Sequence, residues 1–259
     1  MNFTDKIKAE ILSKPIKDNH CKKAFIAGLI RGSGVLYEKD GELGLEFKVP
    51  DEQTALMITS AFSNLFDYEI REVSVTEDKQ NNKDKFYLSI SGKRAIEILI
   101  ELGILIEDQE GVAVDLQFYG NITSKDCCLR AFIRGLFISS GRCTLPTEND
   151  NSSTGYHLEI YFSHYAPALE TSEKLAQNGI LTKIVKRREG YIVYIKSAED
   201  IKDFIDLAVR EKIDLTIPGT NFNTLYQGLF FDKLKEKYIE EARQSWIAQG
   251  NKASNATNP

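Results

Sequence analysis

The sequence lacks several features that would decide its function class at once. No apolar run approaches the ~18 residues that a membrane-spanning helix needs. The N-terminus, MNFTDKIKAEIL, is charged and amphipathic and does not resemble a secretory signal peptide. We therefore expect a cytoplasmic protein without a membrane partner. The net charge of −5 and pI of about 5.4 argue against nucleic-acid binding over the whole surface, and leave a local basic face open.

Cysteine and histidine are scarce, and their spacing predicts no metal site. No CxxC pair and no Cys/His tetrad is visible in the sequence. We therefore predict no structural zinc and no cofactor, and interpret the thiols as buried or half-buried packing residues. The histidines are separated and have no orienting carboxylate in their pattern, so none is assigned a catalytic role. These residues are Cys21, Cys127, Cys128, Cys143, His20, His157 and His164.

The chain repeats one glycine-containing helical motif. Residues 24–34 read AFIAGLIRGSG and residues 131–141 read AFIRGLFISSG. The distance from Gly28 to Gly135 is 107 positions, as is the distance from Gly34 to Gly141. A repeat this far apart in a chain of 259 residues predicts a duplicated unit folded about a pseudo-two-fold axis. Neither copy contains an acidic residue.

Hydrophobic periodicity predicts the same order of elements in each half. We therefore expect an α+β fold of two pseudo-symmetric αββαββα halves, with helices on one face of curved antiparallel sheets. In the first half, the predicted helices cover residues 3–12, 21–31, 51–66 and 93–102, and the strands 35–37, 43–49, 69–76 and 85–91. In the second, the helices cover 125–139, 166–177 and 198–209, and the strands 142–145, 156–162, 181–188 and 191–196.

Composition, helix caps and the positions of proline and glycine predict the domain boundaries. Thr4 is the expected N-cap of the first helix, and Pro15 ends that helix. We expect an N-terminal helical arm (1–18), a first half (19–103), a linker (104–122), a second half (123–210) and a C-terminal helix with a disordered tail (211–259).

The mid-helix glycines indicate a packing role for the repeat. A glycine inside a helix costs ~1 kcal/mol relative to alanine. We therefore predict that the two helices approach closely and form a seam between the halves. The seam residues are Gly28, Ser33, Gly34, Gly135, Ser140 and Gly141. Arg31 and Arg134, also in these helices, are expected to snorkel to solvent at the helix ends.

Residues 26–34 and 133–141 resemble degenerate LAGLIDADG motifs, and the αββαββα order is similar to that fold. In LAGLIDADG homing endonucleases the next-to-last motif residue is an acid, and the two acids hold the divalent metals that cut DNA. The corresponding residues here are Ser33 and Ser140. A neutral hydroxyl does not replace a carboxylate as the main ligand of Mg²⁺. The resemblance therefore implies a protein that is not an enzyme, with no catalytic residue and no metal.

A narrower resemblance is to the WhiA family. It rests on FTDKIKAEIL (3–12), CCLRAFIRGLF (127–137) with Ser140-Gly141, and YHLE (156–159), and covers about residues 2–210. It implies a bacterial regulator of cell division and sporulation whose LAGLIDADG-like domain has no nuclease activity. WhiA proteins continue into a helix-turn-helix domain. The roughly forty residues after Pro218 are predicted to form one helix (225–248) and a polar tail, too little for such a module. Either the chain is shortened or it is a divergent member.

One hairpin is the candidate DNA-binding surface. In the LAGLIDADG fold the hairpins form a saddle along DNA, where basic strand residues suit phosphates. Residues 183–196 contain one acid, Glu189, and two tyrosines, Tyr191 and Tyr194, and the five basic residues Lys183, Lys186, Arg187, Arg188 and Lys196. The equivalent stretch of the first half, residues 67–90, has six acids and four basic residues.

This asymmetry leaves two functions open. The first is a nucleoid-associated transcription regulator that binds double-stranded DNA weakly or through a further domain, as a monomer. The second is a scaffold that binds proteins or senses a ligand and no longer binds DNA. On the second interpretation, the basic hairpin tip is only solvated or docks a partner.

Overall fold

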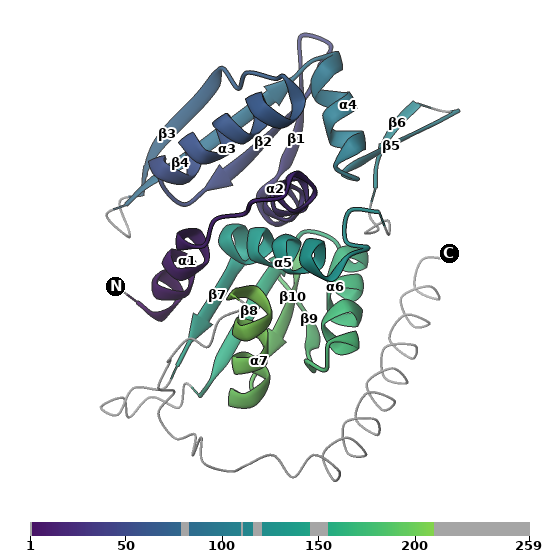
Figure 1. Cartoon of the computed structure of the whole chain (residues 1–259). Helices are drawn as coiled ribbons and strands as arrows, with labels where there is room; N and C mark the ends of the chain where they lie inside the picture. The colour runs from purple at the N-terminus through teal and green to yellow at the C-terminus, as the bar shows by residue number, and fades with distance from the viewer. Residues whose placement is uncertain (1, 79–82, 110, 116–120, 146–154, 210–259) are drawn as a thin grey trace.

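Two four-stranded antiparallel sheets lie on opposite sides of a central pair of helices (Figure 1). The computed structural model describes residues 2–78, 83–109, 111–115, 121–145 and 155–209. None of the helices within those ranges is long and apolar enough to cross a membrane.

The first half follows the predicted order, preceded by a short arm helix. Its helices are α1 (Phe3–Ser13), α2 (Asn19–Ser33), α3 (Glu52–Phe66) and α4 (Lys93–Glu101). Its strands are β1 (Val35–Lys39), β2 (Glu42–Val49), β3 (Glu72–Asp78) and β4 (Lys83–Ser91). The strand order in the sheet is β1-β2-β4-β3.

The second half repeats this arrangement. Its helices are α5 (Asp126–Ser140), α6 (Tyr165–Gln177) and α7 (Ala198–Val209), and its strands are β7 (Gly141–Thr144), β8 (His157–Phe162), β9 (Lys183–Arg187) and β10 (Gly190–Ile195). The strand order β7-β8-β10-β9 matches that of the first sheet. The α+β class and the two pseudo-symmetric halves are therefore confirmed.

Two predictions about the first half and the linker need correction, and one prediction concerns residues that are not described. The N-cap of α1 is Asn2, whose side chain accepts a hydrogen bond from the Asp5 amide, so the predicted Thr4 cap is wrong. The Thr4 hydroxyl instead hydrogen-bonds the backbone of Cys143 and ties α1 to β7. The predicted linker contains a hairpin, β5 (Leu105–Asp108) and β6 (Gly111–Val114). The predicted C-terminal helix lies outside the described residues.

The two repeated helices pack directly against each other between the halves. Two of the predicted seam glycines do not face the other helix: a Cβ added to Gly34 would meet the Ile30 carbonyl, and one added to Gly141 would meet the Phe137 ring. A Cβ added to Gly28 would overlap the carbonyl oxygen of Phe132, and one added to Gly135 would overlap that of Phe25. The backbones of α2 and α5 are therefore in direct contact. Near the helix C-terminal ends, Gly32 similarly leaves no space for a Cβ beside Ser139. Because the contacts advance together along both helices, α2 and α5 run in the same direction.

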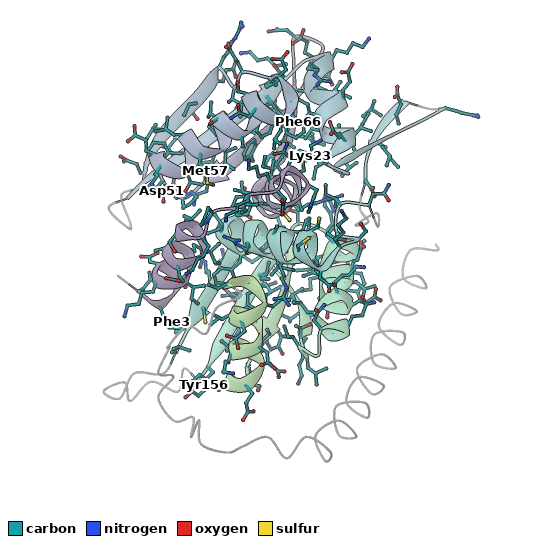
Figure 2. The ribbon with its side chains drawn as sticks, viewed as in Figure 1. Phe3, Lys23, Asp51, Met57, Phe66 and Tyr156 are labelled. Carbon is teal, nitrogen blue, oxygen red and sulfur yellow. The ribbon has the colours of Figure 1, made fainter. Side chains whose placement is uncertain are left out.

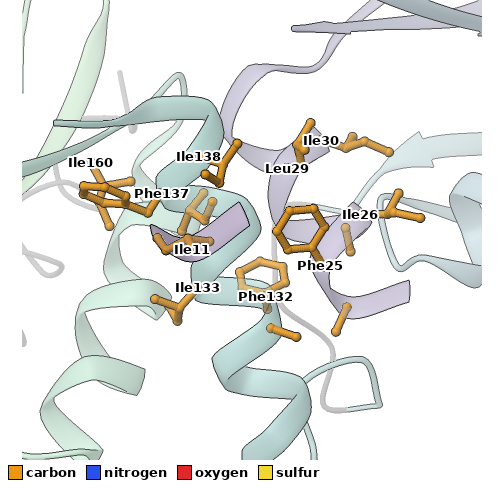
Figure 3. Close-up of a cluster of buried hydrophobic side chains, with 14 of the residues drawn as sticks. Ile11, Phe25, Ile26, Leu29, Ile30, Phe132, Ile133, Phe137, Ile138 and Ile160 are labelled. Carbon is orange, nitrogen blue, oxygen red and sulfur yellow. The ribbon is translucent and has the colours of Figure 1, made fainter. Parts of the chain in front are cut away.

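The core is built around this seam. Figure 3 shows Phe25 and Phe132 facing each other where the helices cross. Aliphatic side chains of both helices extend from that point, toward the first sheet from α2 and toward the second from α5. Phe25, Phe132 and the neighbouring Ile26 and Ile133 are each at most 3% exposed. Burial of these large apolar side chains, together with the seam, joins the halves into one body.

We expect Gly28→Ala and Gly135→Ala each to lower the free energy of unfolding by about 2 kcal/mol or more. The added methyl forces two backbones apart, and overpacking of this kind outweighs the ~1 kcal/mol gain in helix propensity. Urea unfolding monitored by circular dichroism measures this. Gly155→Ala, at a position with no atom within 4 Å of a new Cβ, is the control. Equal stability of Gly28→Ala and wild type would contradict the backbone-contact seam.

Candidate functional site

The C-terminal ends of α2 and α5 correspond to the metal-binding end of LAGLIDADG nucleases, according to the resemblance. The Ser33 hydroxyl accepts a hydrogen bond from the Lys48 amide at 3.1 Å and lies within donating distance of the Leu29 carbonyl. The Ser140 hydroxyl donates to the Leu136 carbonyl at 3.2 Å. Both hydroxyls therefore contact backbone groups: Ser140 those of its own helix, and Ser33 those of its own helix and of β2. No group of three potential metal ligands lies at this end among the residues that the structure describes.

The basic hairpin divides between two faces of the second sheet. Leu158, Ile160 and Ile195 point to the helix-covered side and are buried. The opposite side, here called the second open face, contains Lys183 and Arg187, because strand residues alternate. Lys196 follows β10 in the same alternation, and its ammonium lies 5.7 Å from the Tyr194 ring centroid.

The other two basic residues of the hairpin do not share that face. Lys186 pairs with Tyr191 in the register and therefore points to the other side of the sheet. Arg188 occupies the turn between β9 and β10 with a positive φ of 54°. The predicted five-residue cluster is thus three residues on one open face and two that point elsewhere.

A polar network extends across the second open face. His157 Nε2 lies 3.0 Å from Glu159 Oε2, and the guanidinium of Arg187 lies 3.6 Å from the same carboxylate. The His157 and Tyr194 rings are 5.8 Å apart between centroids. The prediction that no histidine has an orienting carboxylate is therefore wrong for His157. The signal was present in the sequence, because residues two apart on a strand share a face.

The corresponding face of the first sheet is more acidic. The register places Glu46 opposite Ser89, and Ser89 opposite Glu72, so that both carboxylates lie on its open face. Together with Glu42, they border a shallow groove that also includes Tyr37 and Lys39. Burial, and then the charge of Glu72, raises the pKa of Tyr37 above its usual value. A phosphate backbone would meet more negative charge here than on the second open face.

Two arginines of the motif helices are held inside, which contradicts the predicted snorkelling. The Arg31 guanidinium donates to the carbonyl oxygens of Gly103 and Asp115, at the two ends of the β5–β6 hairpin. The Arg134 guanidinium donates to the carbonyls of Ile11 and Lys14, each at 2.7 Å. Burial lowers the pKa of both guanidinium groups. The arginines therefore fasten connecting segments to the seam.

The N-terminal turns of the motif helices bring together residues that the sequence analysis treated separately. His20 and Cys21 come from α2, and Cys127 and Cys128 come from α5. Their potential ligand atoms all lie within 4.8 Å of one another. The prediction that the chain has no Cys/His tetrad is therefore wrong, because the fold brings together four ligands that are distant in the sequence. Spacing motifs missed it because the two pairs are separated by 107 residues, the offset of the repeat itself.

The thiols of this group are packed against one another and against the protein interior. Burial, followed by the neighbouring Cys127, raises the pKa of the Cys21 thiol to about 12. Burial and Cys127 also raise the pKa of Cys128. The fourth cysteine, Cys143, is buried on β7, and burial alone raises its pKa to about 12. All four cysteines are free thiols.

The N-terminal turn of α2 is held against α3 and α4 of the first half. Lys23, two residues after Cys21, forms an ion pair with Glu101 of α4. Figure 2 shows its side chain beside Phe66 at the end of α3, and the ammonium lies 5.4 Å from that ring centroid. These contacts fix the N-terminal turn of α2, and with it the positions of His20 and Cys21.

Comparison with known proteins identifies the class and then the family. The paired helices and the duplicated αββαββα unit define a LAGLIDADG-like protein. A sequence model of the WhiA N-terminal LAGLIDADG-like domain matches residues 19–105, and a model of the WhiA LAGLIDADG-like domain matches residues 129–211. The chain belongs to the WhiA family, as the resemblance implied.

The curated relatives of this chain carry the description probable cell division protein WhiA. The chain is 28% identical over 209 residues to a probable cell division protein WhiA of Caldicellulosiruptor saccharolyticus, covering 80% of this chain and 62% of the relative. It is 31% identical over 208 residues to the Staphylococcus haemolyticus protein of the same description, with the same coverage. The chain therefore spans about three-fifths of the length of these relatives, 62%.

Solved structures show the same fold. The N-terminal LAGLIDADG domain of DUF199/WhiA matches with a TM-score of 0.61 and 20% identity, covering 83% of this chain and 93% of that one. The full-length DUF199/WhiA from Thermatoga maritima matches with a TM-score of 0.57 and 17% identity, covering 99% and 76%. Variants of the homing endonuclease I-DmoI match at 0.50 and 17%, covering 76% and 94%. At these identities the likeness concerns the fold alone.

We expect Arg134→Met to lower the free energy of unfolding by about 1–3 kcal/mol, because two carbonyls at the end of α1 lose their donors. Arg142→Met, at an exposed position on β7, is the matched control and should be near neutral. Chemical denaturation of both variants measures the difference. Equal stability of the two would show that Arg134 is a solvated side chain, as the sequence suggested.

Proposed function

We propose that this protein is a non-catalytic, DNA-binding regulator of cell division whose LAGLIDADG-like domain has lost nuclease activity. The observation that supports DNA binding is the second open face, which contains Lys183, Arg187 and Lys196, with the Lys196 ammonium over the Tyr194 ring. Cations spaced along adjacent strands suit the phosphates of a duplex, and they are the groups that give salt-dependent affinity.

The charge of the two faces argues for one-sided and modest DNA binding. The described charged residues of the second open face are Arg142, Lys183, Arg187, Lys196 and Glu159. Those of the first are Lys39, Lys48, Lys85, Glu42, Glu46 and Glu72. The first face is therefore balanced in charge, while the second is positive. Phosphates would be attracted to one half of the saddle only.

The residues at the seam support the proposed loss of nuclease activity. A divalent cation such as Mg²⁺ is bound mainly through carboxylate oxygens, and two-metal hydrolysis needs such ligands on both sides. Ser33 and Ser140 offer only hydroxyls, and both are hydrogen-bonded to helix backbone. We therefore place no catalytic residue and no catalytic metal in this domain.

A second function, a scaffold that binds a protein or small ligand without binding DNA, is favoured by the acidic groove on the first sheet. Glu42, Glu46 and Glu72 border it, and its charge would suit a cationic peptide or ligand better than a phosphate. The two functions differ in salt-dependent duplex binding, which only the first requires.

We expect the native chain to bind random duplex DNA with an affinity that falls steeply with salt. The variant Lys183→Ala/Arg187→Ala should bind more weakly and lose about 0.9 of the slope of log K against log salt for each lost phosphate contact. Fluorescence anisotropy at several salt concentrations measures both quantities.

The matched control is Lys186→Ala/Arg188→Ala, which removes the same types and number of charges from the same hairpin but off the open face. It should retain the native slope. Equal losses in the two variants would point to general electrostatic attraction. Absence of binding by the native chain would leave the scaffold function in place of this one.

We expect no cleavage of supercoiled or linear duplex DNA in the presence of Mg²⁺ or Mn²⁺, because no carboxylate stands at either motif position. Gel electrophoresis after prolonged incubation detects nicking, with an active homing endonuclease on its own substrate as the positive control. Cleavage above background that disappears in Ser33→Ala/Ser140→Ala would overturn the proposed loss of activity.

A further inference from the structure

The N-terminal ends of α2 and α5 meet at a compact group of four soft ligands, here called the thiol cluster: His20, Cys21, Cys127 and Cys128. His20 Nδ1 lies 3.2 Å from Cys128 Sγ and 3.3 Å from Cys21 Sγ. All four ligand atoms lie within 4.8 Å of one another. Cys21 and Cys128 are buried, Cys127 is half-buried and His20 is exposed. Three thiols and one imidazole thus converge from two helices.

The cluster obeys the symmetry of the fold. His20 and Cys127 are 107 positions apart, as are Cys21 and Cys128, which is the spacing of Gly28 and Gly135. Each half therefore contributes two consecutive residues from the first turn of its motif helix. Because α2 and α5 run in the same direction, the positive ends of both helix dipoles point at this site.

The donor set is that of a closed structural zinc site. Tetrahedral centres with three cysteines and one histidine hold Zn²⁺ without an open position. With bonds of about 2.3 Å to sulfur and about 2.0 Å to nitrogen, neighbouring ligand atoms in such a centre lie roughly 3.5–3.8 Å apart. The two contacts of His20 Nδ1, at 3.2 and 3.3 Å, and the 4.8 Å limit on the other separations lie on either side of these values. Soft thiolate ligands in this geometry select zinc over Mg²⁺ or Ca²⁺.

We propose that His20, Cys21, Cys127 and Cys128 bind one Zn²⁺ ion that fastens the N-terminal ends of α2 and α5 to each other. The ion replaces the three thiol protons, which are released to solvent. The bound centre, Zn²⁺ with three thiolates and a neutral imidazole, carries a net charge of −1, which faces the positive ends of both helix dipoles. It is a structural ion without a vacant coordination position for substrate. It lies at the end of the helix pair remote from Ser33 and Ser140, ~20 Å along α2 at 1.5 Å per residue.

Such an ion would stabilise the arrangement of the two halves. It links positions 107 residues apart in the chain, and a cross-link over a long loop removes much conformational freedom from the unfolded state. The seam glycines hold the middle of the helix pair, and the ion would hold its N-terminal end. This inference does not depend on whether the second open face binds DNA.

A disulfide is the competing explanation for clustered thiols. It would use two of the three cysteines and leave the third, together with the His20 imidazole, without a role. The contacts of His20 Nδ1 with both Cys21 and Cys128 instead indicate a centre in which the imidazole is one of the ligands. Reducing conditions distinguish the two, because they preserve a zinc–thiolate site and open a disulfide.

The test is metal content of the full chain, purified without a histidine tag under reducing conditions. We expect about one zinc per chain by elemental analysis, because four protein ligands close one tetrahedral site. Substitution with Co²⁺ should give the thiolate-to-cobalt charge-transfer band and the intense visible bands of a tetrahedral centre. Zinc removal by a chelator should lower the melting temperature of the native chain.

The variants are His20→Ala and Cys127→Ala, chosen because these side chains are exposed and half-buried, so their loss leaves the core intact. Each should lower zinc affinity by more than about 10-fold, weaken the cobalt spectrum and remove the chelator effect on the melting temperature. Cys143→Ser is the matched control, because Cys143 is the one cysteine outside the cluster, and it should keep the metal.

Three results would overturn the proposal. The first is a reduced native chain that takes up neither Zn²⁺ nor Co²⁺. The second is metal that persists in both His20→Ala and Cys127→Ala. The third is a mass spectrum that shows a disulfide within the cluster in protein purified without reductant, together with no metal uptake after reduction.

Discussion

The backbone contact between α2 and α5 is the constraint on which the rest of the structure depends. Because Gly28 and Gly135 leave no room for a side chain at the crossing, the two helices approach more closely than ordinary packing permits. That approach brings Phe25 and Phe132 together (Figure 3). It therefore also sets how far apart the two halves, and their sheets, can lie. It also places the two helices side by side at both ends of the pair. The thiol cluster lies at the N-terminal end, and the motif serines lie at the C-terminal end.

Much of the fold could be predicted from the sequence, because the relevant signals are local or repeated. Alternation in β2 and β8 and the apolar stripes of α3 and α7 mark elements within a few residues of their observed ends. The offset of 107 positions predicts the duplication and the seam. The caps are less predictable: Asn2 competes with Thr4 for the same helix end, and tertiary contact with Cys143 decides between them.

The candidate site was less accessible to sequence reasoning, because it depends on which residues meet in space. The basic hairpin is evident from composition, but only the register separates Arg187 from Lys186. Arg31 and Arg134 were expected at the surface, since nothing local shows that distant carbonyls need their donors. The thiol cluster is the clearest case. Its ligands match no spacing motif. The repeat offset of 107 positions nevertheless relates His20 to Cys127 and Cys21 to Cys128.

The position of β9 at the edge of its sheet gives its cations a further consequence. An edge strand presents unpaired backbone groups that can recruit a strand from another molecule, and charged side chains are a common protection against it. Exposed Val185 lies on this strand between Lys183 and Arg187. The cations that suit phosphates therefore also keep the sheet from extending into a neighbouring copy. Selection for solubility alone would retain these cations, even in a protein that does not bind DNA.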